Sequence, residues 1–313
     1  MTTYHTMAEY MASVFHRRMQ KIAVNASLGC PNRDGKLSTS GCVYCNNAAF
    51  NPAYAFKSGL SISNQLESGM NFFRRKGEAT GYLAYFQSFS NTYGPTQKLI
   101  SLYEEAIHFH DISGLVIATR PDCLQNDLLD YFQNRFGNSA PDGHPYLLVE
   151  IGVESTNDNT LKRINRGHSF SCAANAIIEL HKRGIPSGVH IILGLPGESE
   201  WDYIQHARHI SDLPVSTIKL HQLQIIRDTP LADEYLQKPD EFSFFTPQSY
   251  ASAVVTFLQE LREDIYIDRF VSEAPADMVL APRWGIKPYK IQRMVNSLLL
   301  NNHTSSTSGS KSE

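Results

Sequence analysis

Short apolar runs recur along the chain, and a segment with helical periodicity lies between most of them. The runs fall at residues 21–27, 82–87, 114–119, 145–153, 187–194 and 216–226, and the helical segments at 62–76, 95–110, 126–136, 171–183 and 199–210. The runs are rich in Val, Ile and Leu, as expected of strands that are covered on both faces. Because a strand, a helix and the next strand form a right-handed parallel unit, the alternation predicts a parallel α/β sheet.

Six such units are two short of a closed eightfold barrel. We therefore expect an α/β fold built as a partial (β/α)6 TIM-type barrel with a C-terminal helical extension, and a flat doubly wound sheet is the alternative. The expected division is an N-terminal helix at 1–20, a barrel core at 21–227, an extension at 228–301 packed on the core, and a tail at 302–313. The extension should hold helices and one short strand at 264–270, and the Ser/Thr-rich tail should be disordered.

The amino-acid composition and net charge exclude several classes of protein. Hydrophobic residues make up 42% and charged residues 19% of the 313 positions, which is ordinary for a globular chain and excludes a fibrous or wholly disordered one. The net charge of −3 excludes a global basic field that would attract nucleic acid, although a local basic patch is compatible with it. The sequence contains neither a run of 18 apolar residues nor a secretory leader pattern, so we expect a cytoplasmic protein that does not engage a membrane.

The five cysteines are unevenly distributed. An odd number in a long chain argues against a disulfide framework. Three of them lie between residues 30 and 45, in the segments Leu28-Gly29-Cys30-Pro31 and Cys42-Val43-Tyr44-Cys45. Cys123 and Cys172 are isolated, and we interpret them as small buried apolar residues.

The three-cysteine loop follows the first predicted strand, at the end of a barrel where active sites lie. A structural zinc ion normally has four ligands, but the next candidates, His108 and His110, are far along the chain. A redox Cys-x-x-Cys pair would not need the third cysteine. Three thiolates suit a cubane [4Fe–4S] cluster and leave its fourth iron open. An incomplete zinc site and three incidental cysteines remain the alternatives.

The pattern Cys30-x11-Cys42-x2-Cys45, with the aromatic Tyr44 before its last cysteine, resembles the radical S-adenosylmethionine (SAM) superfamily. Most members separate the first two cysteines by three residues. The wider gap is similar to that of the subgroup related to the elongator catalytic subunit, and especially of the YhcC/YtqA family. The resemblance covers residues 20 to 300 approximately and ends with APRWGIKPY at 281–289.

The resemblance implies an enzyme with two cofactors. A reduced [4Fe–4S] cluster would be bound by Cys30, Cys42 and Cys45, and the amino and carboxylate groups of SAM would chelate its open iron. One-electron cleavage of SAM would give a 5′-deoxyadenosyl radical that abstracts hydrogen from the substrate. The protein would orient these groups and exclude water and oxygen.

Polar residues after the second and third strands are candidates for SAM contacts. Gln87, Ser88 and Asn91 can hydrogen-bond the ammonium or carboxylate group of SAM, or they can form a turn and cap the next helix. Thr119 lies where the superfamily often places a residue that contacts the ribose. We expect Arg120 to pair with a carboxylate such as Asp122 or Glu150.

The fourth strand and the following loop supply further candidates. Glu150 and Glu154 are four residues apart on one strand and should share a face toward the lumen. The resemblance implies that Glu154 lies near the ribose hydroxyls of SAM. Arg166, in the segment Asn165-Arg166-Gly167-His168, is the candidate for the SAM carboxylate, and a solvated basic loop is the alternative.

The last two strands complete the expected SAM site. His190 is either near SAM or an ordinary core histidine, and Gly194 would let the backbone approach the adenine closely. On the sixth strand, alternation places Lys219, His221 and Leu223 on one face and Leu220, Gln222 and Gln224 on the other. Leu223, with Tyr44 of the cysteine loop, belongs to the predicted cofactor-binding set.

The substrate follows only from the resemblance. It implies modification of a tRNA at a wobble uridine side chain, with flavodoxin or ferredoxin as the class of reductant in the cell. Candidate phosphate contacts are basic residues that otherwise form ordinary solvated surface: Arg17, Arg18, Arg74, Arg75, Lys76, Arg283, Lys287, Lys290 and Arg293. A radical SAM enzyme acting on a small metabolite or a peptide is the first alternative, and a non-catalytic iron–sulfur or zinc protein is the second.

Overall fold

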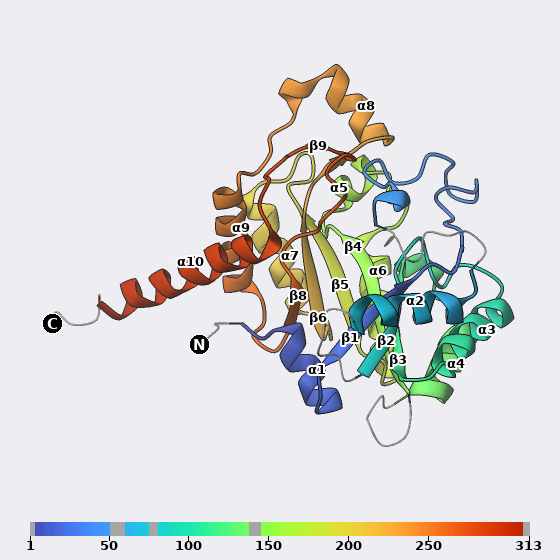
Figure 1. Cartoon of the computed structure of the whole chain (residues 1–313). Coiled ribbons are helices and arrows are strands. Elements are labelled where there is room, and N and C mark those ends of the chain that lie inside the picture. The colour runs from blue at the N-terminus through green and yellow to red at the C-terminus, as the bar shows by residue number, and fades with distance from the viewer. Residues whose placement is uncertain (1–3, 51–59, 75–80, 138–144, 309–313) are drawn as a thin grey trace.

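The computed structural model describes residues 4–50, 60–74, 81–137 and 145–308. Seven parallel strands form one curled sheet in the order β1-β2-β3-β4-β5-β6-β8 (Figure 1). The strands are β1 Met19–Val24, β2 Gly81–Phe86, β3 Ile112–Thr119, β4 Tyr146–Glu154, β5 Ser187–Leu193, β6 Thr217–Gln222 and β8 Tyr266–Arg269. The predicted partial barrel is confirmed with one addition, because the short strand expected in the C-terminal extension pairs with β6 and becomes the seventh strand.

Helices cover the outer face of the sheet. They are α2 Ile62–Arg74, α3 Thr96–Ile107, α4 Asn126–Phe136, α6 Phe170–Lys182 and α7 Glu200–Ser211. Their apolar stripes pack on strand residues such as Phe86, Ile117 and Val149, so the main core lies between the helices and the sheet. A short helix, α5 Asp158–Arg163, was not expected from the sequence.

The inner face of the sheet is divided into an apolar part and a polar part. Helix α1 Met7–Phe15 begins with a capping box at Thr6 and ends at His16, which has a left-handed backbone conformation. Its residues Met7 and Met11 pack on inward-facing residues of β2, β3 and β4, among them Leu83, Val116 and Leu148. This packing fills part of the lumen, and the polar inward-facing residues gather toward the carboxyl ends of the strands. Because α1 ends at Phe15, β1 begins at Met19, earlier than expected.

The C-terminal part adds a two-stranded antiparallel sheet of β7 Ile225–Ile226 and β9 Val279–Ala281. The helices of this part are α8 Pro230–Gln237, α9 Pro247–Glu260 and α10 Pro288–Ser308, with the short 3-10 helix η4 Pro239–Glu241 between α8 and α9. Two other short 3-10 helices, η1 Asn47–Phe50 and η3 Pro121–Cys123, lie earlier in the chain. Helix α10 projects from the body of the molecule and continues to Ser308, past the boundary expected at residue 301 (Figure 1). Residues 309–313 lie outside the described part of the chain, and the disordered tail stays a prediction. The other domain boundaries stay predictions.

The length and hydropathy of a helix determine whether it could span a membrane. Within the described ranges, no helix is both long and apolar enough to cross a membrane.

Candidate active site

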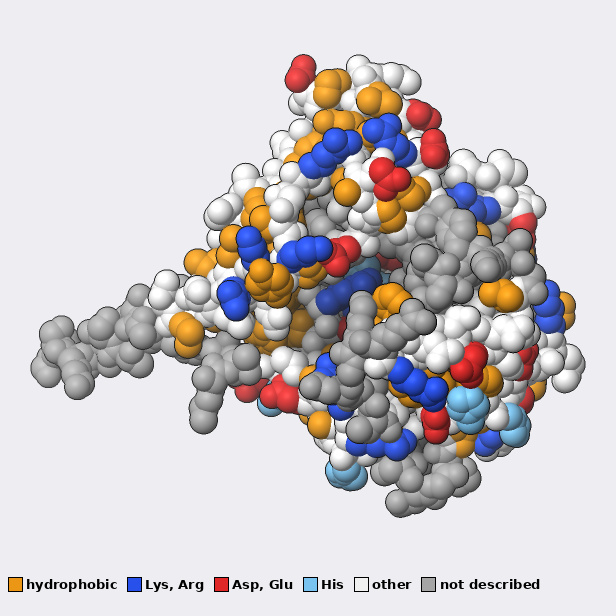
Figure 2. All heavy atoms as spheres, viewed as in Figure 1, with side chains coloured by type: hydrophobic (Ala, Val, Ile, Leu, Met, Phe, Trp, Pro, Cys, Tyr) orange, Lys and Arg blue, Asp and Glu red, His pale blue; other side chains and the backbone are white. Residues whose placement is uncertain are grey.

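A pocket of about 1220 Å³ of empty space, its mouth included, opens at the carboxyl ends of the strands. Its lining comes from the ends of β2 to β6, from β8 and from the cysteine loop. The space-filling view shows a hollow near the centre of the molecule with basic, acidic and histidine side chains inside it (Figure 2). Parallel α/β barrels place their active sites at this end, because the strand-to-helix loops converge there.

The cysteine loop is held over this pocket by backbone hydrogen bonds to two helices. The amide of Val43 donates to the carbonyl of Ile164 at the end of α5 (3.1 Å), and the amide of Leu231 in α8 donates to the carbonyl of Val43 (2.9 Å). The side chains of Val43 and Tyr44 pack on the small apolar cluster that includes Ile164 and Leu231. Cys30, Cys42 and Cys45 all line the pocket as free thiols.

Asn165 fixes the path of the loop between the cysteines. Its side-chain amide donates to the carbonyl of Gly41 (2.7 Å), and its own carbonyl accepts from the side chain of Asn32 (2.6 Å). The Asn32 side chain also lies 3.5 Å from the sulfur of Cys42. The segment Asn165-Arg166-Gly167-His168, singled out in the sequence, thus serves partly to position the cysteines.

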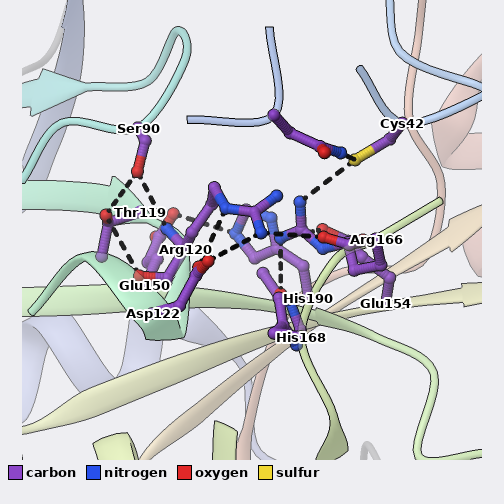
Figure 3. Close-up of polar contacts among 12 residues, drawn as sticks. Cys42, Ser90, Thr119, Arg120, Asp122, Glu150, Glu154, Arg166, His168 and His190 are labelled. Atoms are coloured by element: carbon purple, nitrogen blue, oxygen red, sulfur yellow. Dashed lines mark hydrogen bonds and ion pairs between the residues drawn. The ribbon is translucent and has the colours of Figure 1, made fainter. Parts of the chain in front are cut away.

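Arg166 joins the cysteine loop to β4 (Figure 3). Its guanidinium donates to the Cys42 sulfur (3.5 Å) and to the carbonyl of Gly152 (2.6 Å), and it lies 3.4 Å from the carboxylate of Glu154. Burial lowers the pKa of this guanidinium, but Tyr44, Cys42 and Glu154 outweigh burial and raise its pKa well above its usual value. The solvated-loop alternative for Arg166 is therefore wrong, since the residue is buried. The Nε atom of Arg166 is buried and has no hydrogen-bond partner among the described residues.

Hydroxyl groups connect the ends of β2 and β3. The Thr119 hydroxyl hydrogen-bonds those of Ser90 (3.0 Å) and Thr92 (2.6 Å), and Thr119 lines the pocket (Figure 3). Asn91 is buried beside them and donates to the carbonyls of Phe86 and Ala118. Asn91 therefore holds the strand ends together, outside the lining of the pocket.

Arg120 pairs with Asp122, as the sequence predicted. Its Nε and one terminal nitrogen each lie 2.9 Å from an oxygen of that carboxylate, and the guanidinium also donates to the carbonyl of Arg166. The pair anchors the loop that carries Arg166 to the end of β3.

Glu150 is the centre of an ionic cluster that crosses the lumen. Its carboxylate lies 2.5 Å from the ammonium of Lys219, 3.2 Å from that of Lys21 and 3.1 Å from the ring of His190. The Lys21 ammonium also lies 2.5 Å from Asp268, so the cluster connects β1, β4, β5, β6 and β8. Burial raises the pKa of Glu150, but the two lysines and His190 hold it well below its usual value.

Glu154 lines the same pocket as Glu150, as the spacing predicted. The pairing register of β4 with β5 shifts between Gly152 and Glu154, and Glu154 has a positive φ of 69°. The strand is therefore irregular where it delivers the second carboxylate to the pocket.

Two histidines continue the polar lining toward β8. The ring of His190 stacks on that of His221, with centroids 5.5 Å apart, and His221 Nε2 lies 3.0 Å from the guanidinium of Arg269. Burial lowers the pKa of His190, and burial together with Arg269 lowers the pKa of His221 well below its usual value. Both rings are therefore neutral near pH 7.

The structure brings most of the sequence-predicted site residues together. Those that line the pocket are Cys30, Cys42, Tyr44, Cys45, Gln87, Ser88, Thr119, Glu154, Arg166, His190 and Leu223. Two do not: Asn91 lies behind the strand ends, and Gly194 lies where an added Cβ would come 3.0 Å from the ring of Phe245. The roles of all these residues toward SAM stay predictions.

Tyr85, Arg269 and Ser272 line the pocket but were not singled out in the sequence. Tyr85 lies inside an apolar run, where an aromatic residue is ordinarily core. Arg269 and Ser272 lie in a segment that the sequence placed in the extension and not in the barrel. Strand alternation would have turned Tyr85 inward, but nothing in the sequence indicated that β8 joins the sheet.

The donor set of the pocket fits an iron–sulfur cluster. Three thiols face one space, and a guanidinium donates to one of their sulfurs. Three cysteine sulfurs are the ligands that a cubane cluster with one open iron takes. Over the residues that the structure describes, no three Cys, His, Asp or Glu side chains are close enough to hold one metal ion. A zinc ion needs all its sulfur ligands within about 2.3 Å, whereas each cysteine of a cubane cluster binds a different iron. The three thiols are therefore the candidate ligands of such a cluster.

Comparison with known proteins defines the class. The sequence profile of the radical SAM superfamily matches residues 24–210, and that of the radical SAM C-terminal domain matches residues 215–300. The chain therefore belongs to the radical SAM superfamily, whose enzymes use a [4Fe–4S] cluster, SAM and a reductant. The predicted enzyme class and cofactors are confirmed.

The particular family is that of YtqA and YhcC. YtqA of Bacillus subtilis (strain 168) is 30% identical over 298 residues, which cover 95% of this chain and 90% of YtqA. YhcC of Escherichia coli (strain K12) is 30% identical over 270 residues, which cover 86% of this chain and 84% of YhcC.

The chain also has weaker similarity to proteins related to the elongator catalytic subunit. The tRNA uridine(34) acetyltransferase of Dehalococcoides mccartyi (strain CBDB1) is 25% identical over 176 residues, which are 55% of this chain and 36% of that protein. The solved structure of Elp3 from Methanocaldococcus infernus, with residues 1–46 deleted, matches with a TM-score of 0.67 at 15% identity, over 91% of this chain and 63% of that one. The chain thus spans less than two thirds of the Elp3 structure, and the likeness shows a shared fold.

Proposed function

We propose that this enzyme modifies a tRNA at the side chain of its wobble uridine, in the cytoplasm, with SAM as the source of the radical. In this proposal Cys30, Cys42 and Cys45 hold a [4Fe–4S] cluster. When bound and reduced, the cluster supplies the electron that cleaves SAM, and flavodoxin or ferredoxin is the proposed class of reductant. The observation that carries the chemistry is the meeting of three thiols with Arg166 and Glu154 in one pocket.

The residues of the chain bind and orient SAM in this proposal. Arg166 binds the carboxylate of SAM, because its guanidinium reaches the cysteine loop and has a buried Nε without a described partner. Glu154 and Thr119 accept hydrogen bonds from the ribose hydroxyls. Gln87 and Ser88, at the end of β2, meet the ammonium group.

The lumen below this site is lined by buried polar groups that bond one another. The Lys219 ammonium is buried and donates to both Glu150 and the hydroxyl of Tyr85 (2.9 Å). Burial and the nearby Glu150 raise the pKa of Tyr85 well above its usual value, so the phenol keeps its proton. A closed polar floor of this kind excludes water from a reactive radical.

The tRNA substrate is supported by the similarity to the tRNA uridine(34) acetyltransferase. Surface charge is consistent with it, because Arg283, Lys287, Lys290 and Arg293 are exposed on the segment that follows β9. Strand β9 pairs with β7, whose Ile226 lines the pocket, and Lys or Arg side chains are visible beside the hollow in Figure 2. Arg75 and Lys76, also predicted as phosphate contacts, lie outside the described residues.

The direct test is an anaerobic reaction of reconstituted enzyme, SAM and reductant with tRNA from a strain that lacks the gene. Nucleoside mass spectrometry should show a new uridine derivative at the wobble position and 5′-deoxyadenosine formation stimulated by that tRNA. Fully modified tRNA from the parent strain is the matched control and should not stimulate the reaction. If neither tRNA stimulates 5′-deoxyadenosine formation, the tRNA proposal is contradicted, and a metabolite or a peptide is favoured as the substrate.

The four exposed basic residues after β9, at positions 283, 287, 290 and 293, give a second test of tRNA binding. Removing one cation that neutralises a phosphate should reduce the slope of log affinity against log salt by about 0.9. We expect a smaller slope for the variant with Gln at positions 283, 287, 290 and 293. The control Lys182→Gln, on the exposed face of α6, should keep the wild-type slope.

A further inference from the structure

Arg269 is a cation of the pocket whose charge is not compensated by a carboxylate. Across the described residues, no Asp or Glu oxygen lies within 4.0 Å of its guanidinium, and its buried Nε has no hydrogen-bond partner. Its one described side-chain partner is His221 Nε2, at 3.0 Å. A partly buried positive charge without a counterion is costly, so its retention in a pocket needs a ligand to explain it.

The neighbouring charges do not supply that counterion. Glu150 and Asp268 face two ammonium groups, those of Lys21 and Lys219, so the ionic cluster is balanced by itself. Glu154 is engaged by Arg166 on the other side of the lining. The deep part of the pocket therefore keeps one net positive charge at Arg269.

His221 is arranged to support an anion at this position. Since a guanidinium has only donors, Nε2 of His221 must be the acceptor, and the proton of the neutral ring is then on Nδ1. The His190 ring of β5 stacks on His221 and is itself fixed by a hydrogen bond to the buried Glu150 of β4. Gln224 and the hydroxyl of Ser272, 3.3 Å apart, add neutral polar groups to the same lining.

We propose that Arg269, positioned by His221, binds an oxyanion of the substrate, a phosphate or a carboxylate, inside the radical SAM pocket. The carboxylate of SAM is a different anion in this proposal, because it is assigned to Arg166, which contacts the Cys42 sulfur and Glu154 and not His221. The inference rests on the proposed function only for the source of the anion: with tRNA it is a phosphate beside the uridine, and with a metabolite it is a phosphate or carboxylate of that molecule. Arg269 is then a substrate-binding residue of the pocket.

The test uses the cluster-loaded enzyme saturated with SAM, so that the carboxylate of SAM already occupies its own position. Inorganic phosphate and acetate are the probes, and the melting temperature is the readout, because a ligand that binds the folded state raises it. We expect one or both anions to raise the melting temperature of the wild type and of Arg208→Gln, whose guanidinium bonds Glu260 outside the pocket. Arg269→Gln should lose this effect, with an affinity at least about tenfold weaker.

Arg269→Lys keeps the charge but not the forked geometry, so it should retain part of the effect, and it serves as the test variant if Arg269→Gln does not fold. A larger effect of phosphate than of acetate identifies the phosphate source, and the reverse identifies a carboxylate. Equal stabilisation of all variants, or loss of the anion effect when SAM is present, would overturn the proposal. Weaker SAM binding by Arg269→Gln would also overturn it and assign Arg269 to SAM.

Binding experiments with uridine and uridine 5′-monophosphate distinguish this proposal from the proposed tRNA function. Uridine 5′-monophosphate should bind wild-type enzyme more tightly than uridine, and Arg269→Gln should bind the two alike. If neither nucleoside binds while the simple anions still depend on Arg269, the tRNA function fails and the anion site stands. If uridine binds and the phosphate adds nothing, the anion site fails and the tRNA function stands.

Discussion

The Cys42 sulfur has two described side-chain contacts, because both Asn32 and Arg166 donate to it at 3.5 Å. These contacts fix the position of the sulfur at one corner of the pocket. At the scale of residues, the site is thus an arrangement of donors around a cysteine sulfur, and the polar groups beside it are those proposed to bind SAM.

Replacement of Cys42 by Ala tests this arrangement. We expect the variant to lose bound iron and sulfide and to form no 5′-deoxyadenosine, because two thiols remain in the loop. Cys172→Ala is the control, since Cys172 is a half-buried residue of the first turn of α6 and does not line the pocket. A Cys42→Ala enzyme that still cleaves SAM would contradict the ligand assignment.

His168 makes stability depend on pH. Burial and the charges of Arg166 and Arg120 lower its pKa to about 3, against the hydrogen bond to the Ser169 carbonyl and the charge of Asp122, which raise it. The unfolded chain has a histidine pKa of about 6.5. Below about pH 6.5 the unfolded state therefore binds more protons, and the free energy of unfolding falls as the pH is lowered toward 3.

His168→Gln should remove this contribution. Urea unfolding at several pH values from neutral to mildly acidic should show a smaller loss of stability for the variant than for the wild type. The exposed His181, changed to Gln, is the control and should keep the wild-type dependence. Parallel curves for His168→Gln and the wild type would contradict the assignment.

The site was predictable at this scale where a residue lies at the end of an apolar run. Thr119, Glu154 and His190 follow directly from strand position, and the cysteines from their spacing. Asn91 and Gly194 could not be placed because a local motif does not show whether a side chain faces the lumen or the adjoining strand end. Tyr85 was missed because an inward-facing aromatic in an apolar run looks like core.

Strand ends are the elements that deliver the site. The end of β4 is irregular: its register shifts after Gly152, and Glu154 has a left-handed backbone conformation. A Cβ at Gly152 would lie 2.4 Å from the Arg166 guanidinium and 2.6 Å from the Glu154 carboxylate. Only glycine leaves room for Arg166 to reach both the β4 backbone and Cys42.

Gly152→Ala should therefore displace Arg166 and weaken SAM binding by about tenfold or more, the equivalent of one charge-assisted hydrogen bond. The fold should survive, because the atoms that clash are the ends of long side chains. Equilibrium dialysis with labelled SAM measures the effect. Gly29→Ala is the control, since its added Cβ would meet only the Tyr93 ring at 3.7 Å, and equal SAM affinity in both variants would argue against the role of Arg166.

Most elements were predictable from the alternation of apolar runs and helices, and α4 even has the predicted bounds of Asn126–Phe136. Two features were not. The short helix α5 owes its position to packing of Leu161 and Ile164 under the cysteine loop, which is a tertiary effect. Strand β8 is only four residues long and joins the sheet through β6 and the backbone near Thr6, contacts that are distant in sequence.

At the scale of the whole molecule, the ionic cluster around Glu150 links five strands across the lumen of an incompletely closed barrel. The two edge strands, β1 and β8, do not pair with each other, but Lys21 of β1 and Asp268 of β8 meet at 2.5 Å. Glu150 of the central strand β4 contacts both lysines of the cluster. The cluster thus supports the floor of the pocket and the curvature of the sheet together.

Glu150→Gln should destabilise the protein by about 3–5 kcal/mol, because it leaves a buried ammonium group without its full complement of counterions. Urea unfolding measures this loss, and Glu179→Gln, whose partly exposed carboxylate pairs with Arg183 on the surface of α6, is the control with a much smaller expected change. Since the pKa of Glu150 is held low in the folded state, its contribution is complete above about pH 4.3 and is lost as the pH falls below that value. A Glu150→Gln protein as stable as the control would show that the cluster contributes little to the fold.

We propose above all that the three-cysteine pocket binds a [4Fe–4S] cluster and SAM and cleaves SAM reductively. The measurement that tests it most directly is the amount of 5′-deoxyadenosine formed by anaerobically reconstituted protein with SAM and dithionite, per cluster bound. We expect formation by the wild type and by Cys172→Ala, and none by Cys42→Ala. A wild-type protein with a full cluster that forms no 5′-deoxyadenosine would contradict reductive cleavage of SAM in this pocket.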